Sequence, residues 1–503
     1  MILNHNEYVD KVRACWIGKN IGGTMGTPYE GTHEYLDVKG FVTKKGEVLP
    51  NDDLDLQLVW LHALEKIGPY NISAATLGEF WISYITPHWN EYGLGKNNMK
   101  RGLLPPLAGD YQNHWNNSNG AWIRTEIWAC TTPGCPAAAA KYAIEDAKVD
   151  HGAGEGTFAA AFVAAMQSAA FVIKDIRRCI EVGLASVPES CRVAKSVKYV
   201  IEAYDKGVSH RECRDNVQQM NADLGNGWFE APSNVAYTVI GLLYGEGDFK
   251  KSMIAAINCG DDTDCTAATL GATLGILNGM AGIPQDWMEY IGDDIITISI
   301  AKGNRARNLP NNCKELTERV VALAPSVIFA NRIYTGTESN YTKFDDVKLT
   351  EVSEGDVDRI MEMARYVGEQ FETLKPYMTR FENVCFAADV TVSPTPDITP
   401  GGEVKVGIRF QNILQENNPY NLTLRWLLPE GFTVEGGRRA LILDEQNAHT
   451  SKCRYWGWGD FPTASVEFVI KAGDKVEAVN RAVLEVVAEG RPNIMYIPVT
   501  LLG

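Results

Sequence analysis

The sequence lacks three features that are typical of secreted or membrane-bound proteins. No basic stretch followed by an apolar run stands at the N-terminus, so we expect no signal peptide. The longest apolar run, 158–173, is too short and too rich in alanine to span a bilayer, and it predicts a buried helix. The eleven cysteines are scattered and contain no CxxC pair. We therefore expect reduced thiols in a cytoplasmic protein, without a disulfide framework or a zinc site.

Positive charge is also scarce relative to negative charge. Lys and Arg number 47 against 63 Asp and Glu, which gives a formal net charge of −16. Such a surface repels nucleic-acid phosphates and anionic lipids, so we expect neither nucleic acid nor a membrane as a partner. A small anionic ligand stays open, because a local site can oppose the overall field.

The 503 residues exceed what one hydrophobic core usually fills, so the chain is expected to be multidomain. Residues 1–335 are rich in Ala, Gly, Leu and Ile at helical spacing and predict an all-α domain. Residues 336–384 are more polar and contain an amphipathic helix at 354–371, which we interpret as a helical extension or linker.

Residues 385–503 have a different character. Short alternating segments follow one another at regular intervals, separated by Pro and Gly, and this pattern is typical of an all-β, immunoglobulin-like sandwich. The predicted strands are 389–393, 404–410, 422–427, 440–443, 464–470, 482–487 and 494–501. Trp426, Trp456 and Trp458 could stack on sugar rings or pack in the core, so a glycan or a protein partner for this domain stays open.

Two acidic clusters each precede a predicted helix, at 51–55 (NDDLD) and at 261–266 (DDTDCT). One carboxylate in such a place is explained by helix capping, but three neighbouring carboxylates repel one another unless a cation neutralises them. Oxygen donors without a nearby Cys/His set favour Mg²⁺ or Mn²⁺, and two clusters that meet could hold two ions. Solvated helix caps are the alternative. A third segment, the glycine-rich turn 18–31, contains Glu30 and matches neither a P-loop nor a dinucleotide fingerprint.

In this order, the segments resemble the ADP-ribosylglycohydrolase family. The family pattern runs G-x-x-x-G-D-x-x-G-x-P-x-E, T/S-D-D-T, G-N-G-x-x-M-R, a histidine and G-G-D-T-D-T. The sequence has matching stretches at Gly18 to Glu30, at Asn51 to Leu54, at Ser118 to Arg124, at Asp150 to Gly152 and at Gly260 to Cys265. The resemblance covers about the first 300 residues.

The resemblance implies an all-α fold with two bound Mg²⁺ ions, or Mn²⁺ in their place, that hydrolyses a glycosidic bond to ribose. The most direct expectation is release of ADP-ribose from a modified acceptor. The implied metal ligands are Asn51, Asp52, Asp53, Asp262, Asp264 and Cys265. The implied catalytic residues are Glu30, Asp53 and Asp264, and the implied substrate-binding residues are Arg124, His151, Asn119, Gly120 and Phe229.

Five positions depart from the family pattern. Gly23 stands for Asp, Asn51 for Thr or Ser, Leu54 for Thr, Asp261 for Gly and Cys265 for Thr. An amide oxygen can still bind a metal ion, whereas a thiol is a poor ligand for magnesium. The departures leave two alternatives open: a hydrolase of the same fold that cleaves another pentofuranosyl or glycosyl linkage, and a non-catalytic ADP-ribose-binding protein.

Several of these residues also have simpler structural interpretations. Glu30 could be a surface acid of its loop, and His151 could be a structural residue at the start of a helix. Arg124 could pair with Glu126 or Asp110. The loop 102–119, rich in Pro, Gly, Asn and aromatic residues, is expected to border the pocket.

Overall fold

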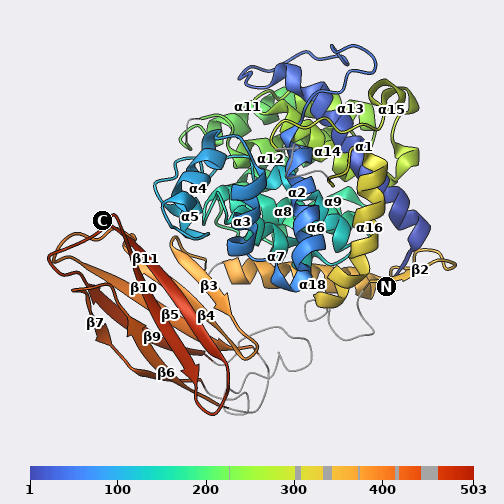
Figure 1. Ribbon diagram of the computed structural model, residues 1–503. Coiled ribbons are helices and arrows are strands. Elements are labelled where there is room, and N and C mark those ends of the chain that lie inside the picture. Colours follow the sequence, from blue (N-terminus) through green and yellow to red (C-terminus); the bar gives the residue numbers. More distant parts are fainter. Residues whose placement is uncertain (226, 301–307, 332–341, 372–373, 414–418, 443–462) are drawn as a thin grey trace.

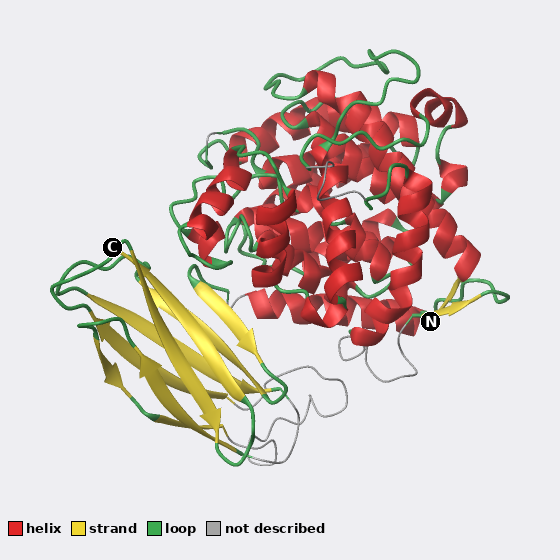
Figure 2. Cartoon of the chain, in the orientation of Figure 1, coloured by secondary structure: helices red, strands yellow, loops and turns green. Residues whose placement is uncertain are grey.

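The computed structural model describes the chain except residues 226, 301–307, 332–341, 372–373, 414–418 and 443–462. Helices form the N-terminal part and strands form the C-terminal part, and the two lie beside each other (Figures 1 and 2). The predicted fold class, a helical domain followed by a β-sandwich, is therefore confirmed. Trp456 and Trp458 lie outside the described residues.

The described helical part contains α-helices of 4 to 22 residues and several short 3₁₀ turns. The α-helices are α1 (His5–Gly26), α2 (Asp52–Ile67), α3 (Ala74–Tyr84), α4 (Asn90–Lys100), α5 (Leu107–Asp110), α6 (Glu126–Thr131), α7 (Pro136–Ala147), α8 (Glu155–Ala170), α9 (Ile176–Ala185), α10 (Arg192–Asp205), α11 (His210–Met220), α12 (Ala231–Tyr244), α13 (Phe249–Ile257), α14 (Thr263–Asn278), α15 (Gln285–Ile291), α16 (Cys313–Ala330) and α18 (Glu354–Phe371). The 3₁₀ turns are η1 (Thr27–Tyr29), η2 (Pro69–Asn71), η3 (Trp122–Arg124) and η4 (Met280–Gly282).

Helices α1 and α14 pack against each other more closely than ordinary side chains allow. A β-carbon at Gly18 would overlap the carbonyl group of Gly271, and one at Gly22 would overlap that of Ala267. The facing pairs repeat every four residues in antiparallel order, namely Ala14 with Gly275, Gly18 with Gly271, Gly22 with Ala267 and Gly26 with Thr263. This packing places the C-terminal end of α1 at the N-terminal end of α14.

The sandwich consists of two antiparallel sheets. A four-stranded sheet has the order β11-β10-β6-β8, and a five-stranded sheet has the order β3-β4-β5-β9-β7. Buried side chains of both sheets, such as Val406, Phe410, Leu484 and Ile497, form one core. The strands are β3 (Met378–Glu382), β4 (Phe386–Ser393), β5 (Glu403–Asn412), β6 (Tyr420–Leu427), β7 (Thr433–Gly436), β8 (Arg439–Ile442), β9 (Thr463–Lys471), β10 (Val479–Ala488) and β11 (Ile494–Leu502).

The segment predicted as a helical extension, 336–384, contributes to both parts. Strand β2 (Lys343–Asp345) pairs in parallel with β1 (Ile2–Asn4), and α18 packs against α7 and α9. Strand β3 instead pairs with β4, so the five-stranded sheet already includes residues before 385. The division into domains at 335 and 384 stays a prediction.

The cysteines and the apolar helices have simple environments. The ten cysteines among the described residues are buried, and none of these ten forms a disulfide. The apolar run 158–173 forms most of the buried helix α8. Among the described residues, no helix combines the length and the hydropathy that crossing a membrane requires.

Candidate active site

The first acidic cluster forms the N-terminal turn of α2. Asn51 caps the helix, and its side-chain oxygen accepts a hydrogen bond from the backbone N–H of Asp53 at 2.8 Å. Asp52 accepts a hydrogen bond from the Tyr92 hydroxyl at 3.0 Å. Asp53 is fully buried, and neither of its carboxylate oxygens has a hydrogen-bond partner among the described residues. Asp53 is therefore a buried carboxyl group that helix capping does not explain.

Asp55 differs from the other two aspartates of this turn. Its carboxylate accepts hydrogen bonds from the backbone N–H groups of Ile298 and Ser299, both at 2.6 Å. These bonds hold a distant loop against α2. Asp55 thus has a structural role within the cluster.

The second acidic cluster forms the start of α14. Asp262 Oδ2 accepts a hydrogen bond from the Asn119 side-chain amide at 2.6 Å. Asp262 Oδ1 and Asp264 Oδ1 are buried and have no hydrogen-bond partner in the part of the chain that the structure describes. These oxygens are therefore available as ligands for a cation.

The structure brings the two clusters and the Glu30 loop together. Ligand atoms of Asp53, Asp264 and Cys265 lie within 4.8 Å of one another. Ligand atoms of Glu30, Asp262 and Asp264 form a second group within the same limit. Asp264 belongs to both groups, so it lies at the centre of the site. The mainly oxygen donor set fits a hard divalent cation.

Burial and mutual repulsion together raise the pKa values of these carboxyls. The charge of Asp264, followed by partial burial, raises the pKa of Glu30 to about 8. Burial, followed by the charge of Asp264, raises the pKa of Asp52 to about 6. Burial is also the largest cause of the raised pKa values of Asp53 and Asp262. Divalent cations would remove this repulsion, because they favour the ionised form of each carboxylate.

A buried ion pair supports the site from below. Lys19 Nζ lies 3.0 Å from Glu126 Oε1, and both side chains are fully buried. Gln57 and Gln167 donate to Glu126 at 2.7 and 3.0 Å. The charge of Lys19 also lowers the pKa of Asp53, although burial has the larger, opposite effect. Lys19 therefore offsets part of the negative charge, but it is already paired with Glu126.

Asp261, the carboxylate that stands where the family has glycine, points away from this cluster. Its backbone is in the left-handed region, with φ of 64°. One side-chain oxygen accepts from the backbone N–H of Phe229 at 2.8 Å, and the other accepts from Asn234 Nδ2 at 3.2 Å. Its backbone pairs with that of Thr32 in the Glu30 loop. Asp261 thus joins the Glu30 loop, the Phe229 loop and α12.

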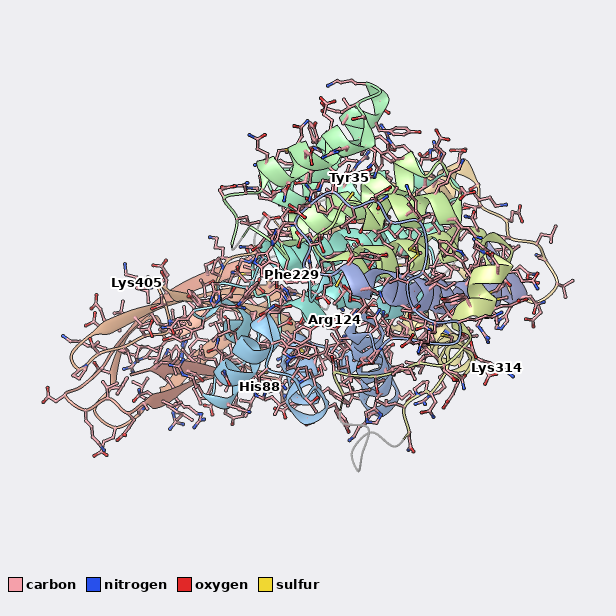
Figure 3. The ribbon with its side chains drawn as sticks, turned by 90° about the horizontal axis from the view of Figure 1, so that it is seen from above. Tyr35, His88, Arg124, Phe229, Lys314 and Lys405 are labelled. Atoms are coloured by element: carbon pink, nitrogen blue, oxygen red, sulfur yellow. The ribbon has the colours of Figure 1, made fainter. Side chains whose placement is uncertain are left out.

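Phe229 is half-buried with φ of 58°, and Asp261 connects it to the Glu30 loop. Its ring stacks on Trp228 with 4.4 Å between ring centroids, and Trp228 in turn contacts His33 at 5.0 Å. Glu30 is exposed in the adjacent loop. Seen from above, Phe229 and Arg124 belong to the helical domain, whereas Lys405 lies far out on the sandwich (Figure 3).

Arg124 lies behind the site and is fully buried. Its guanidinium donates to Asp146 and Asp150, each at a shortest distance of 2.8 Å, and its central carbon lies 4.6 Å from the ring centroid of Trp81. The structural interpretation of Arg124 in the sequence named Glu126 or Asp110 as its partner, and this is corrected. Glu126 pairs with Lys19, and Asp110 accepts from backbone N–H groups.

His151, Asn119 and Gly120 form part of the same buried wall. His151 Nδ1 lies 2.8 Å from Asp150 Oδ1, and its Nε2 lies 3.3 Å from Ser118 Oγ. A β-carbon at Gly120 would overlap the carboxylate of Glu91. Of these three residues, Asn119 reaches the acidic cluster directly through its bond to Asp262. The substrate-binding roles of Arg124, His151, Asn119, Gly120 and Phe229 stay predictions.

Four residues near the site were not identified from the sequence. Tyr92 and Glu91 reach it from the first turn of α4, and Lys19 and Glu126 meet beneath it. Each looks like an ordinary surface residue in a linear sequence. The one available signal in the sequence concerns Lys19, which stands directly after Gly18 in the glycine-rich part of α1.

The helical part of the chain matches a known protein family. The family model described as ADP-ribosylglycohydrolase matches residues 4–321. A comparison with curated proteins gave no match. Among solved structures, an ADP-ribosylglycohydrolase-related protein complex is similar, with 18% identity, a TM-score of 0.43, and coverage of 64% of this chain and 99% of that one. A FixG-related protein from Vibrio parahaemolyticus has 7% identity, a TM-score of 0.17, and coverage of 23% of this chain and 94% of that one. The family model spans more than half of the residues of this chain. The chain therefore belongs to the ADP-ribosylglycohydrolase family and is a glycosyl hydrolase of that type.

Proposed function

We propose that the chain hydrolyses a glycosidic bond to ribose with the help of two Mg²⁺ ions, or Mn²⁺ in their place, and releases ADP-ribose from a modified acceptor. One observation carries the proposal. Asp264 is shared by two groups of potential ligands, and oxygens of Asp53, Asp262 and Asp264 are buried without hydrogen-bond partners among the described residues. An uncompensated buried carboxylate is costly, so its retention favours a cation-binding role.

Asp53, Asp262 and Asp264 would hold the ions, with Asp52, Asn51 and Cys265 beside them. When bound, the ions neutralise these carboxylates and orient the hydroxyl groups of the sugar ring. Cys265 is the least suited donor, because thiolates favour softer metals than magnesium. The charge of Lys19, which is paired with Glu126, lowers the pKa of Asp53 and so favours its ionised form.

Glu30 would move a proton at the sugar. Departure of the leaving group builds positive charge on the ring, and glycosidases manage this step with carboxyl groups. Glu30 lies in an exposed loop beside Asp262 and Asp264, and in the metal-free protein the charge of Asp264, followed by burial, raises its pKa to about 8. In its protonated form Glu30 would donate a proton to the leaving group, and the resulting carboxylate would later accept one from water.

The test combines metal binding with turnover on an ADP-ribosylated protein. Asp262→Asn with Asp264→Asn should abolish Mn²⁺ binding in calorimetry and also abolish ADP-ribose release. Asp261→Asn is the matched control, because Asp261 is a neighbouring buried carboxylate that points away from the cluster, so Mn²⁺ binding should be retained. Full activity of the wild-type protein in EDTA would refute the metal dependence.

A related activity stays as a second candidate, hydrolysis of another pentofuranosyl or glycosyl linkage. It is favoured by Asp261, which replaces a family glycine and accepts a hydrogen bond from the backbone N–H of Phe229 near the Glu30 loop. A change at this place alters the surface that a leaving group would meet. A panel of nucleosides and furanosides, assayed beside ADP-ribosylated protein, distinguishes the two: faster turnover of a furanoside would favour the second.

A further inference from the structure

The segment that connects α4 to η3 contacts the sandwich near one end and the carboxylate cluster near the other. Figure 1 shows α4 and α5 on the side of the helical domain that faces the sandwich. The family model ends at residue 321, so the family does not explain what the sandwich does for the site. The contacts of this segment offer an explanation.

The sandwich holds the segment through polar and apolar contacts. The Tyr111 hydroxyl donates to Asp397 Oδ1 at 2.5 Å, and Thr500 Oγ1 donates to the carbonyl oxygen of Gly102 at 3.2 Å. The backbone N–H of Tyr377, next to β3, donates to Asp110 Oδ2 at 2.8 Å. One apolar cluster is shared by both parts of the protein and contains Leu103, Leu107, Ala108, Tyr111 and Leu502.

The middle of the segment is interwoven with a second loop, 148–156. The other oxygen of Asp110 accepts from the backbone N–H of Ala153 at 2.7 Å. Asn113 Nδ2 donates to the carbonyl oxygen of Asp150 at 2.6 Å. The Asn116 carbonyl oxygen accepts from the Gly156 N–H at 3.2 Å. We call residues 107–119 and 148–156 together the double loop.

The far end of the double loop reaches the site. Ser118 Oγ lies 3.3 Å from His151 Nε2, which joins the two loops once more. Asn119 then donates to Asp262 Oδ2 at 2.6 Å. This bond occupies one oxygen of Asp262 and leaves the other, Oδ1, without a hydrogen-bond partner among the described residues. The position of Asn119 thus determines how Asp262 presents its free oxygen.

We propose that the C-terminal sandwich is a positioning domain, which holds the double loop through Asp110 and Tyr111 and so fixes Asn119 against Asp262. Asp110 and Tyr111 are positioning residues, since they act through Asn119. The proposal rests on the proposed function where it concerns turnover, but the held conformation of the double loop is a property of the protein without substrate.

The environment of Asp110 supports this role. Its carboxylate is largely buried between the two parts of the protein, and burial raises its pKa to about 6. Only two backbone donors of the described residues, those of Tyr377 and Ala153, are seen to bind its oxygens. Burying a carboxyl group costs free energy. At this position, the single side chain of Asp110 connects the sandwich to the double loop.

The experiment uses full-length variants that change the interface and nothing in the site. Asp397→Ala removes the acceptor of the Tyr111 hydroxyl, whereas Asp397→Asn keeps an acceptor oxygen and serves as the conservative rescue. Thr423→Val is the matched control, because it removes the side-chain hydrogen bond between Thr423 of β6 and Glu489 elsewhere in the sandwich. Tyr111→Phe tests the same bond from the other side without a loss of packing volume.

Four quantities are measured: hydrogen exchange of the amides in 113–121, Mn²⁺ affinity by calorimetry, kcat, and KM. For Asp397→Ala and Tyr111→Phe we expect exchange about fivefold faster and Mn²⁺ binding weaker by a similar factor, the effect of one lost hydrogen bond. Asp397→Asn and Thr423→Val should behave as the wild type.

Unchanged exchange in 113–121 for both Asp397→Ala and Tyr111→Phe would overturn the proposal, whatever the enzyme does. Equal effects of Thr423→Val would overturn it too, because they would show general softening of the sandwich. If exchange rises as expected but the wild-type protein binds no Mn²⁺, the positioning role stands and the proposed function fails.

Discussion

Gly23 of α1 lies directly against the side-chain amide of Asn51 at the start of α2, so closely that a β-carbon at position 23 would overlap the amide nitrogen. Both positions depart from the family pattern, which has Asp at the first and Thr or Ser at the second. The larger side chain at 51 occupies space that a side chain at 23 would need. The two departures therefore form one compensated change next to the acidic cluster.

This contact predicts the effect of filling position 23. Gly23→Ala should destabilise the protein by about 1–3 kcal/mol, the usual cost of overpacking, and weaken Mn²⁺ binding because Asn51 must move. Gly40→Ala is the control, since a β-carbon there meets open space. Adding Asn51→Thr to Gly23→Ala should restore stability. Urea unfolding and calorimetry measure both effects, and a neutral Gly23→Ala would show that the overlap is relieved at no cost.

Glu30 is predicted to act on the proton and to contribute little to metal binding. Glu30→Gln should lower kcat by about 10²- to 10⁴-fold, the range for loss of a general acid or base, while Mn²⁺ affinity stays within about threefold. Glu34→Gln, an exposed acid of the same loop, should leave kcat unchanged. Steady-state kinetics and calorimetry are the measurements. A Glu30→Gln variant with wild-type kcat would remove Glu30 from the mechanism.

Asp261 provides a test of how the backbone of Phe229 is fixed. Asp261→Gly removes the acceptor of the Phe229 N–H, yet glycine suits the positive φ of 64° without strain. We expect KM to rise about three- to tenfold with kcat nearly unchanged, and the amides of 227–230 to exchange faster. Asp261→Asn keeps an acceptor for the Phe229 N–H, so its KM and the exchange of these amides should stay near the wild-type values. Equal KM values in all three proteins would show that Phe229 needs no such support.

The raised carboxyl pKa values predict how pH acts on the metal-free protein. Glu30 and Asp52 have pKa values of about 8 and about 6 in the folded state, above the usual values of about 4 in an unfolded chain. Between pH 4 and pH 8 the folded state therefore binds more protons, and the free energy of unfolding falls as pH rises. In EDTA, the urea midpoint should be lower at pH 8 than at pH 5.

Adding Mg²⁺ should reverse this dependence. Metal binding displaces protons from the carboxyls, so Mg²⁺ should stabilise the protein more at pH 8 than at pH 5. The same urea experiment with excess Mg²⁺ measures the effect. A midpoint in EDTA that does not change between the two pH values would contradict the clustering of these carboxyls.

Local patterns in the sequence were sufficient to predict much of the fold. The predicted helix 354–371 has the bounds of α18, and the predicted strand 422–427 lies within β6 (Tyr420–Leu427). Periodicity identifies such elements because each buries one face. Strands β3 and β7 were missed, since they are short edge strands with little buried surface to impose an alternating pattern.

The site was predictable where its residues cluster in sequence and not where they meet only in space. Asp52, Asp53, Asp262 and Asp264 stand in two short runs, and their crowding is itself the signal. The bond between Tyr92 and Asp52 joins helices that no local pattern relates, as does the contact between Lys19 and Glu126. Whether a charged residue is buried can be judged only when its partner is known. The Lys19–Glu126 pair and the Tyr92–Asp52 bond could therefore not be predicted from the sequence.

The close contact of α1 with α14 has a consequence for how this enzyme can change over evolutionary time. Because the two backbones touch along Gly18, Gly22 and Gly26, inserting one residue into either helix would rotate everything beyond it by about 100° and shift it by about 1.5 Å. Glu30 and Asp264 would then lose their alignment. Substitutions of the ligand residues leave the packing of α1 against α14 intact, whereas changes in the length of either helix do not. We therefore expect the family to diverge by substitutions and by changes in its loops.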